Sequence, residues 1–189
     1  MFSIKRSLLM ALCALATTWA SAQTLRVGLA EDPDVLDPTL ARTFVGRIVF
    51  AALCDKLVDV DEKLNLVPQL ALSWQWSADS KALTMKLRPG VTFHDGTPLT
   101  AELAANILRS AIALPRNRSL YPSFVDVAAI TTTGDRELMF QVKQPSAFLP
   151  ENLELPLSIG GEGIGTGPYR VVDTNPSEIA LERFEKYRL

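Results

Sequence analysis

The sequence is poor in the side chains that bind metals or perform nucleophilic catalysis. Its 189 residues include one histidine, His94, and two cysteines, Cys13 and Cys54. A structural zinc site needs several Cys, His or acidic ligands, and no C-x-x-C pattern occurs. His94 stands beside Asp95, as in a base–orienter pair, but no G-x-S-x-G nucleophile motif accompanies it. We therefore expect no metal or other cofactor, and a secreted hydrolase is an alternative that depends on this pair alone.

The sequence also lacks a basic patch and, beyond its first residues, a long apolar run. It has 19 Lys and Arg against 21 Asp and Glu, a net charge of −2, and the charges are scattered. Nucleic-acid binding needs clustered basic residues, so we expect no nucleic-acid partner. A membrane-spanning helix needs ~20 consecutive apolar residues. No such run follows residue 22, which predicts a soluble mature chain.

The amino-terminal residues have the pattern of a secretory signal peptide. Two basic side chains precede an apolar run from Leu8 to Ala16, and Ala20-Ser21-Ala22 forms an A-x-A cleavage site. We predict that residues 1–22 are a cleaved signal peptide. Residues 23–189 then form an exported mature chain of about one domain.

Loss of the signal peptide would leave Cys54 as the only cysteine. It lies in FAALCDKLV, among apolar neighbours, so we expect a buried structural thiol rather than a reactive one. No internal disulfide can form, and the sequence leaves open whether Cys54 pairs between chains.

Hydrophobic periodicity and turn residues predict a mixture of helices, strands and hairpins. Helices are expected at 43–53 and 101–113, the second with Thr100 as its N-cap. The other expected elements are strands at 24–29 and 57–60, a short helical turn within 66–74 that begins at Pro68, hairpins at 74–90 and 125–145, and strands at 169–173 and 178–184. This order favours an α/β (mixed α+β) domain with a mixed β-sheet over a doubly wound parallel sheet.

Two loops need separate interpretation. Asp95-Gly96-Thr97-Pro98 has the residues of a tight turn, which favours a structural role for His94. The segment 160–167, GGEGIGTG, contains no G-x-G-x-x-G motif and leads into a strand, so dinucleotide binding is disfavoured. Its glycines either let the backbone approach another backbone or a ligand closely, or form a flexible connection between sheets.

Three ordered segments resemble the family 5 extracellular solute-binding proteins of ABC importers. They are VLDP with the following helix and LVDVDEKLNLVPQLALSW, then ALSWQWSADSKALTMKLRPGVTFHDGTPLTAE, then GTGPYRVV. After Ala101-Glu102 the family usually has an acidic residue and then Val, where this sequence has LAA. The resemblance implies that residues 23–189 are a first-lobe portion of a type II (Venus-flytrap) periplasmic binding protein, without the second lobe.

The resemblance also implies a set of ligand-binding residues. In peptide-binding relatives, the loop after VLDP hydrogen-bonds the extended ligand through its backbone, as in strand addition. The implied residues are Ala41, Arg42, Thr43 and Phe44, with Tyr121, Thr166 and Gly167 as further candidates. Arg42 departs from the acidic residue of some peptide binders. The alternative is that the loop merely leads into the helix.

The implied function is a periplasmic, non-enzymatic component that binds a solute and delivers it to an ABC permease in the inner membrane. The family's ligands include peptides, nickel complexes, haem and opines, and the sequence does not choose among them. We expect a monomer. Because EIALERFEKYRL ends directly after an expected strand, whose sheet would have an exposed edge, a truncated and non-functional fragment is the alternative.

Overall fold

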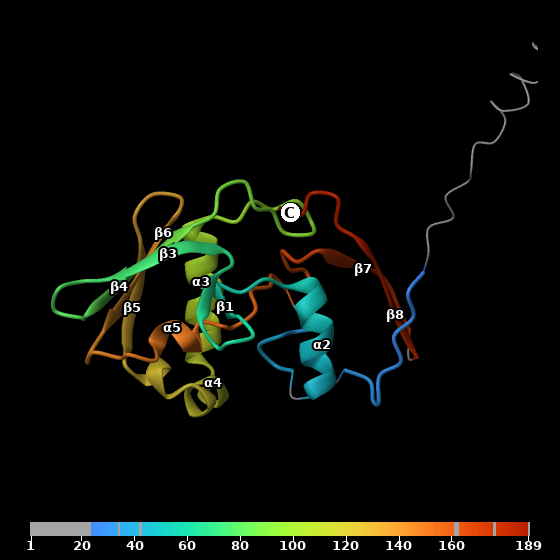
Figure 1. The fold of residues 1–189 in the computed structure, drawn as a ribbon, viewed down its shortest axis with the longest axis horizontal. Coiled ribbons are helices and arrows are strands. Elements are labelled where there is room, and N and C mark those ends of the chain that lie inside the picture. Colours follow the sequence, from blue (N-terminus) through green and yellow to red (C-terminus); the bar gives the residue numbers. More distant parts are fainter. Residues whose placement is uncertain (1–23, 34, 42, 161–162, 176, 189) are drawn as a thin grey trace, which may run out of the picture.

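The computed structural model describes residues 24–33, 35–41, 43–160, 163–175 and 177–188 (Figure 1). The helices are α2 (Phe44–Leu53), α3 (Ala101–Ala113), α4 (Pro115–Leu120), the 3₁₀ turn η1 (Pro122–Val125) and α5 (Leu149–Asn152). The strands are β1 (Val58–Val60), β2 (Leu66–Pro68), β3 (Ala71–Trp76), β4 (Ala82–Leu87), β5 (Val127–Thr132), β6 (Glu137–Val142), β7 (Tyr169–Asn175) and β8 (Glu178–Arg183). The predicted signal peptide, residues 1–22, lies outside the described residues.

A four-stranded antiparallel sheet with the order β3-β4-β6-β5 carries the larger core. Leu83 of β4 pairs with Trp76 of β3 on one side and with Phe140 of β6 on the other. Alternate residues of β4 and β6 are buried on one face: Leu83, Met85, Leu87, Leu138, Phe140 and Val142. Both hairpins expected from the sequence are therefore confirmed, since each has alternating apolar residues and a polar turn.

Helix α3 packs on the sheet (Figure 1). The Oγ1 of Thr100 accepts a hydrogen bond from the backbone N–H of Leu103 at 3.1 Å and caps the helix, as predicted. Leu108 and Ile112 lie on its buried side, in the same core as the strands. The helix ends before Pro115, because a residue that precedes proline avoids the helical conformation. The predicted bounds, 101–113, are confirmed.

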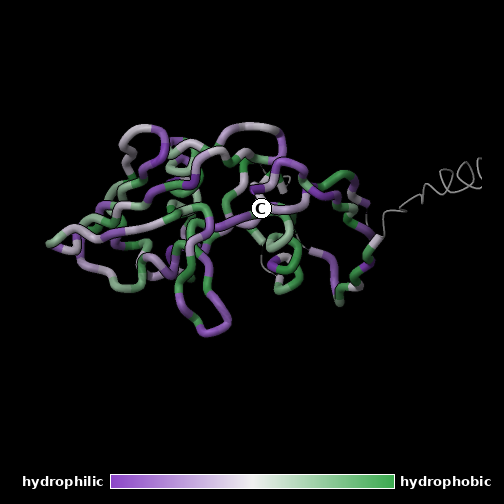
Figure 2. Tube along the Cα trace, turned by 45° about the horizontal axis from the view of Figure 1, so that its top comes forward, coloured by the Kyte–Doolittle hydropathy of each residue, from purple (hydrophilic) through white to green (hydrophobic). Residues whose placement is uncertain are grey.

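A second hydrophobic cluster joins α2 to the antiparallel ribbon of β7 and β8. Buried residues of α2 and its C-cap meet partly buried residues of the ribbon and of the segment before the helix: Val49, Phe50, Leu53 and Cys54 against Val171, Ile179, Leu181, Leu36 and Ala41. Figure 1 places α2, β7 and β8 at one end and the sheet with α3, α4 and α5 at the other. Hydrophobic segments run through both parts, while several connecting loops are hydrophilic (Figure 2). The described residues thus form two apolar clusters.

Two expected elements were wrong. Residues 24–29 form no strand, because no described strand lies beside them to complete a hydrogen-bonded ladder. Leu25 and Val27 in this segment are 86% and 65% exposed. The segment 66–74 contains no helical turn: β2 pairs with β1, and Ala71 begins β3. Pro68 ends β2 in a two-stranded sheet, where a strand tolerates a residue without an N–H.

The mixed α+β class is confirmed, but the kind of sheet differs from the expectation. Among the described strands every pair is antiparallel, whereas a mixed sheet was predicted. Short connections join β1 to β2, β3 to β4 and β5 to β6, and a hairpin makes its two strands antiparallel. The pair of β4 and β6 is antiparallel as well, although α3 and β5 lie between them in the chain.

Candidate functional site

The segment that leads into α2 is built by Asp37. Its Oδ1 accepts hydrogen bonds from the backbone N–H of Thr39 at 2.8 Å and from the Thr39 hydroxyl at 2.7 Å. Its carbonyl oxygen accepts from the N–H groups of Leu40 at 3.1 Å and Ala41 at 2.9 Å. Such bonds from an Asp to the residues that follow it are typical of turns. The turn before the expected ligand loop is therefore local chemistry of the sequence DPTLA.

The expected ligand loop itself ends at the start of α2. The Oγ1 of Thr43 accepts a hydrogen bond from the N–H of Gly46 at 3.1 Å, so Thr43 is the N-cap. Ala41 and Thr43 are half-buried, whereas the side chain of Phe44 is 74% exposed. Arg42 lies outside the described residues. The remaining three expected residues lie just before and at the start of α2.

Arg116 of α4 binds this segment from the opposite side. Its Nη1 donates to the carbonyl oxygen of Leu40 and its Nη2 to that of Ala41, each at 2.8 Å. The planar guanidinium thus contacts two successive carbonyl groups with two parallel donors. The sequence analysis did not find this contact, because Arg116 lies 76 positions from Leu40.

An open groove of about 480 Å³ lies beside the same segment. Three parts of the chain form its walls: the turn before α2, one side of α3 with its C-cap, and the stretch after α5. The lining residues are Asp37, Thr39, Leu40, Asn106, Ile107, Ser110, Ala111, Leu114, Ser158, Ile159 and Gly160. Apolar walls with a few polar side chains suit the binding of a small molecule.

The α3 wall of the groove was not expected from the sequence. Asn106 and Ser110 are exposed polar residues four positions apart, so they share one face of the helix. The four-residue spacing of these polar residues was the only feature of the sequence that could have indicated the α3 wall. The same spacing occurs on any solvent-facing side of a helix, so it does not identify a binding surface. Tyr121, an expected ligand contact, is half-buried and its ring lies 5.1 Å from that of Phe124; it does not line the groove.

The last two expected ligand residues, Thr166 and Gly167, lie in the interior. Thr166 is 2% exposed, and its hydroxyl donates to Oδ2 of Asp55 at 3.1 Å. The N–H of Gly167 donates to the carbonyl oxygen of Leu53 at 2.9 Å. A Cβ at Gly165 or Gly167 would overlap the backbone at Leu53. Of the two interpretations of this glycine segment, close approach to another backbone is the one observed.

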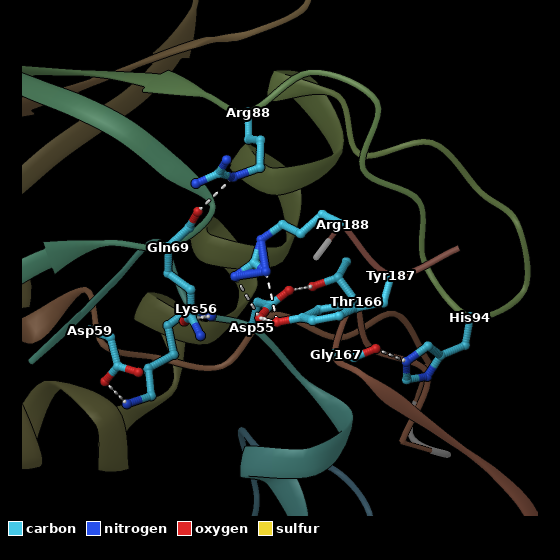
Figure 3. Close-up of polar contacts among 10 residues, drawn as sticks. All are labelled: Asp55, Lys56, Asp59, Gln69, Arg88, His94, Thr166, Gly167, Tyr187 and Arg188. Carbon is cyan, nitrogen blue, oxygen red and sulfur yellow. Dashed lines mark hydrogen bonds and ion pairs between the residues drawn. The ribbon is translucent and has the colours of Figure 1, made fainter. Parts of the chain in front are cut away.

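His94, in the turn at 93–98, forms hydrogen bonds with the same glycine segment (Figure 3). Its Nδ1 accepts from the N–H of Gly165 at 3.3 Å, and its Nε2 lies 3.1 Å from the carbonyl oxygen of Gly167. These partners require the neutral tautomer with hydrogen on Nε2. Burial lowers the pKa of His94, which agrees with a neutral ring. The ring also meets Phe184 edge-on at 5.0 Å, so the predicted structural role of His94 is what the contacts support.

Asp55 is a buried carboxylate where three parts of the chain meet (Figure 3). Besides Thr166, its Oδ1 accepts from Nη2 of Arg188 at 3.1 Å and from the hydroxyl of Tyr187 at 3.3 Å. Burial raises the pKa of Asp55, and the positive charge of Arg188 opposes that rise. Asp55 connects the end of α2, the glycine segment and the last described residues.

Cys54 is 4% exposed and sits at the C-cap of α2. Burial raises its pKa to about 12, and the negative charge of Asp55 adds to the effect. A thiol that stays protonated at neutral pH is a weak nucleophile. The prediction of a buried structural thiol is therefore confirmed.

The described part of the chain contains no group of three or more His, Cys, Asp or Glu side chains arranged to hold a metal ion. Within that same part, no helix has the length and apolar character to cross a membrane. The geometry nearest to a site is thus the groove together with the Asp37–Phe44 segment, which offers backbone groups and small polar side chains.

Comparison with known protein families shows which family the chain belongs to. Residues 65–188, more than half of the chain, match the model of the bacterial extracellular solute-binding proteins, family 5 Middle. The chain belongs to this family. A probable peptide ABC transporter periplasmic-binding protein y4tO of Sinorhizobium fredii is 31% identical over 84% of this chain and 30% of the relative. The glutathione-binding protein GsiB of Pectobacterium atrosepticum is 29% identical over 80% of this chain and 32% of the relative.

Solved structures share the fold. An ABC transporter substrate-binding protein from Sinorhizobium meliloti superposes with a TM-score of 0.79 and 22% identity, over 88% of this chain and 36% of its own. NikZ from Campylobacter jejuni, in complex with Ni(L-His), gives 0.72 and 22% identity, over 84% of this chain and 35% of its own. The fold is therefore part of a type II periplasmic binding protein. The family 5 chain described here spans about a third of the length of the relatives it matches.

Proposed function

We propose that this family 5 chain supplies one wall of the ligand site in a solute-binding component of an ABC importer. The component binds a peptide or a related small solute without converting it and delivers it to the membrane permease. The names of the relatives support this proposal: one is a glutathione-binding protein and another a probable peptide-binding protein of an ABC transporter. The predicted signal peptide supports a periplasmic location, and we propose that the protein is a monomer there.

The observation that carries the proposal is the segment from Asp37 to Phe44. Asp37 and Arg116 hydrogen-bond its residues up to Ala41, Thr39 and Leu40 line an open groove, and Phe44 offers an exposed aromatic ring. Within it, Thr43 and Phe44 are the residues we assign to direct ligand contact. Both polar backbone groups of Ala41 already have partners, since its N–H binds Asp37 and its carbonyl binds Arg116.

The other proposed residues act at different distances from the ligand. Tyr121 follows α4 and its half-buried ring packs against Phe124, so we propose for it at most a supporting contact outside the groove. Thr166 and Gly167 support the site from the interior, because the hydroxyl of Thr166 binds Asp55 and the N–H of Gly167 binds Leu53. We place Arg42 with the contact residues on the resemblance alone.

A single wall limits the affinity. Small-molecule sites in proteins bury about 70–90% of the ligand surface, which one open groove does not achieve. The isolated chain is therefore expected to bind weakly, with dissociation constants in the millimolar range, corresponding to about −4 kcal/mol. A chain without any affinity would match the alternative of a non-functional fragment.

The test is calorimetry on residues 23–189 with three probes: reduced glutathione, trialanine and the nickel–histidine complex. We expect heat of binding with at least one probe and its loss in Phe44→Ala. Phe148→Ala is the matched control, since Phe148 is similarly exposed, at 71%, but directly precedes α5 and lies outside the segment before α2. If the folded chain binds no probe, or if both variants weaken binding equally, the proposed wall is wrong.

A further inference from the structure

Arg116 makes a contact that neither the family relationship nor the proposed function explains. Helix α4 has six residues and begins at Pro115, directly after α3. Two of its side chains bind the carboxyl-terminal end of α3: the Asn117 amide donates to the carbonyl oxygen of Ala111 at 2.8 Å, and Arg118 Nε to that of Ile112 at 3.0 Å. Asn117 is 3% exposed. Helix α4 is therefore fixed on α3, which in turn packs on the four-stranded sheet.

From helix α4, Arg116 hydrogen-bonds the segment that packs against the α2 cluster. The carbonyl groups of Leu40 and Ala41 belong to the segment before α2, and Ala41 packs against the α2 cluster. The contact thus joins the sheet-bearing part to the segment that precedes α2. It also lies next to the groove, because Leu40 lines one wall and Leu114, just before α4, lines another.

The bonds of Arg116 complement those of Asp37. Asp37 binds the N–H groups of Leu40 and Ala41, and Arg116 binds their carbonyl groups. The peptide group between Leu40 and Ala41 is therefore held at both ends, its N–H by the carbonyl oxygen of Asp37 and its carbonyl oxygen by the charged Arg116. Charge-assisted hydrogen bonds from a rigid two-pronged donor fix orientation better than a single neutral bond.

We propose that Arg116 is the positioning residue of the ligand site, which sets the orientation of Leu40 and Ala41 against α3 through their carbonyl groups. This inference rests on the proposed function. Without Arg116 the segment keeps its local Asp37 turn but loses its tie to α4. Leu40, which lines the groove, then samples several orientations, and ligand binding has to select one of them.

Hydrogen exchange on the mature chain tests the positioning without any ligand. In Arg116→Gln we expect amides of residues 40–46 to exchange about tenfold faster, which corresponds to about 1.4 kcal/mol of lost protection. Amides of α3 should be unchanged. Arg118→Gln is the matched control, because it removes an arginine–carbonyl bond from the same helix but leaves the segment 40–46 untouched. Unchanged exchange at 40–46 in Arg116→Gln would overturn the proposal.

Arg116→Lys separates geometry from charge. Lysine keeps the positive charge but has no planar pair of donors, so we expect exchange at 40–46 close to that of Arg116→Gln. Exchange equal to wild type in the lysine variant would show that charge alone suffices and would contradict positioning by two bonds.

Titration with reduced glutathione, trialanine and the nickel–histidine complex adds the functional readout. Arg116→Gln should weaken binding of the accepted probe about threefold to tenfold, while its urea midpoint stays equal to that of Arg118→Gln. Equal affinity in the two variants would overturn the positioning role. A wild-type chain that binds no probe contradicts the proposed function, and the exchange result then decides the role of Arg116 separately.

Discussion

The imidazole of His94 and the carbonyl oxygen of Gly167 lie 3.1 Å apart although 73 positions separate them. The other ring nitrogen accepts the N–H of Gly165, so one side chain holds both ends of a Gly-Thr-Gly segment. A protonated ring cannot accept that N–H. The contact therefore makes the stability of this region depend on the charge of His94.

Stability should fall with acid through His94. Its folded-state pKa is lowered by burial below the ordinary value of 6.5, so the unfolded chain binds the proton more readily. The contribution is complete above pH 6.5 and is lost as the pH falls below that value toward the folded pKa. His94→Ala should cost about 1–3 kcal/mol at pH 7.5 through the lost hydrogen bonds, and less at pH 5.5. Urea unfolding of both proteins at these pH values measures the difference, and a difference independent of pH would contradict the assignment.

Alanine at Gly167 should destabilise the fold strongly. A Cβ there would lie 2.5 Å from the carbonyl carbon of Leu53, in backbone that cannot rotate away. Overpacking typically costs about 1–3 kcal/mol, and a clash with backbone places Gly167→Ala at the upper end of that range. Gly28→Ala is the control, because nothing lies within 4 Å of its Cβ position, and its effect should stay within about 0.5 kcal/mol. Equal thermal midpoints for the two variants would show that the close approach carries no energetic weight.

Asp55→Asn removes the carboxylate and should leave the buried positive charge of Arg188 without its partner. The side chain of Arg188 is only 14% exposed, and breaking such a pair costs about 3–5 kcal/mol. Asp59→Asn supplies the comparison, since Asp59 pairs with Lys56 at the surface, where an ion pair is worth about 0–1 kcal/mol. Denaturant unfolding at pH 7 should rank Asp55→Asn far below Asp59→Asn. If Asp55→Asn were as stable as Asp59→Asn, or more stable, the contacts of Asp55 with Arg188, Tyr187 and Thr166 would have no structural role.

The cap of α3 gives a smaller effect. Thr100→Ala removes the acceptor for the N–H of Leu103 and should cost about 1 kcal/mol. Thr133→Ala changes an exposed threonine in the β5–β6 turn and serves as the reference substitution. Thermal unfolding followed by circular dichroism compares them. A cap variant as stable as the reference would mean that the bond contributes nothing.

Cys54 should resist alkylation in the native state. With its pKa raised to about 12, almost no thiolate exists at pH 8, and its 4% exposure blocks the reagent as well. Iodoacetamide at pH 8 should label the chain in 6 M urea on the order of 100 times faster than without denaturant. Rapid labelling of the folded chain would argue against a buried thiol and would reopen pairing between chains.

Much of the fold could be predicted because its determinants are local. The bounds of α3 follow from Thr100, a stripe of apolar residues and Pro115, and both hairpins follow from alternation around polar turns. The strand expected at 24–29 failed for the opposite reason: a strand needs a partner, and apolar alternation cannot say whether one is present. The glycine segment was ambiguous until the backbone of Leu53 was seen against it.

The candidate ligand site could be predicted only in part from the sequence. The sequence drew attention to Ala41, Thr43 and Phe44 through a resemblance, and the local turn at Asp37 explains why the chain bends there. The groove wall on α3 and the two bonds of Arg116 were not expected, because no pattern within a few residues encodes them.

By itself the sequence determined helices α2 and α3 and both hairpins, since caps and apolar spacing specify them, and it carried the resemblance to a binding-protein family. Only the tertiary structure decided that Arg116 binds the segment before α2, that His94 holds the glycine segment and that Asp55 meets Arg188. Those contacts join groups 73 to 133 positions apart, and a polar side chain finds such a partner only after two apolar clusters have packed and brought the segments together.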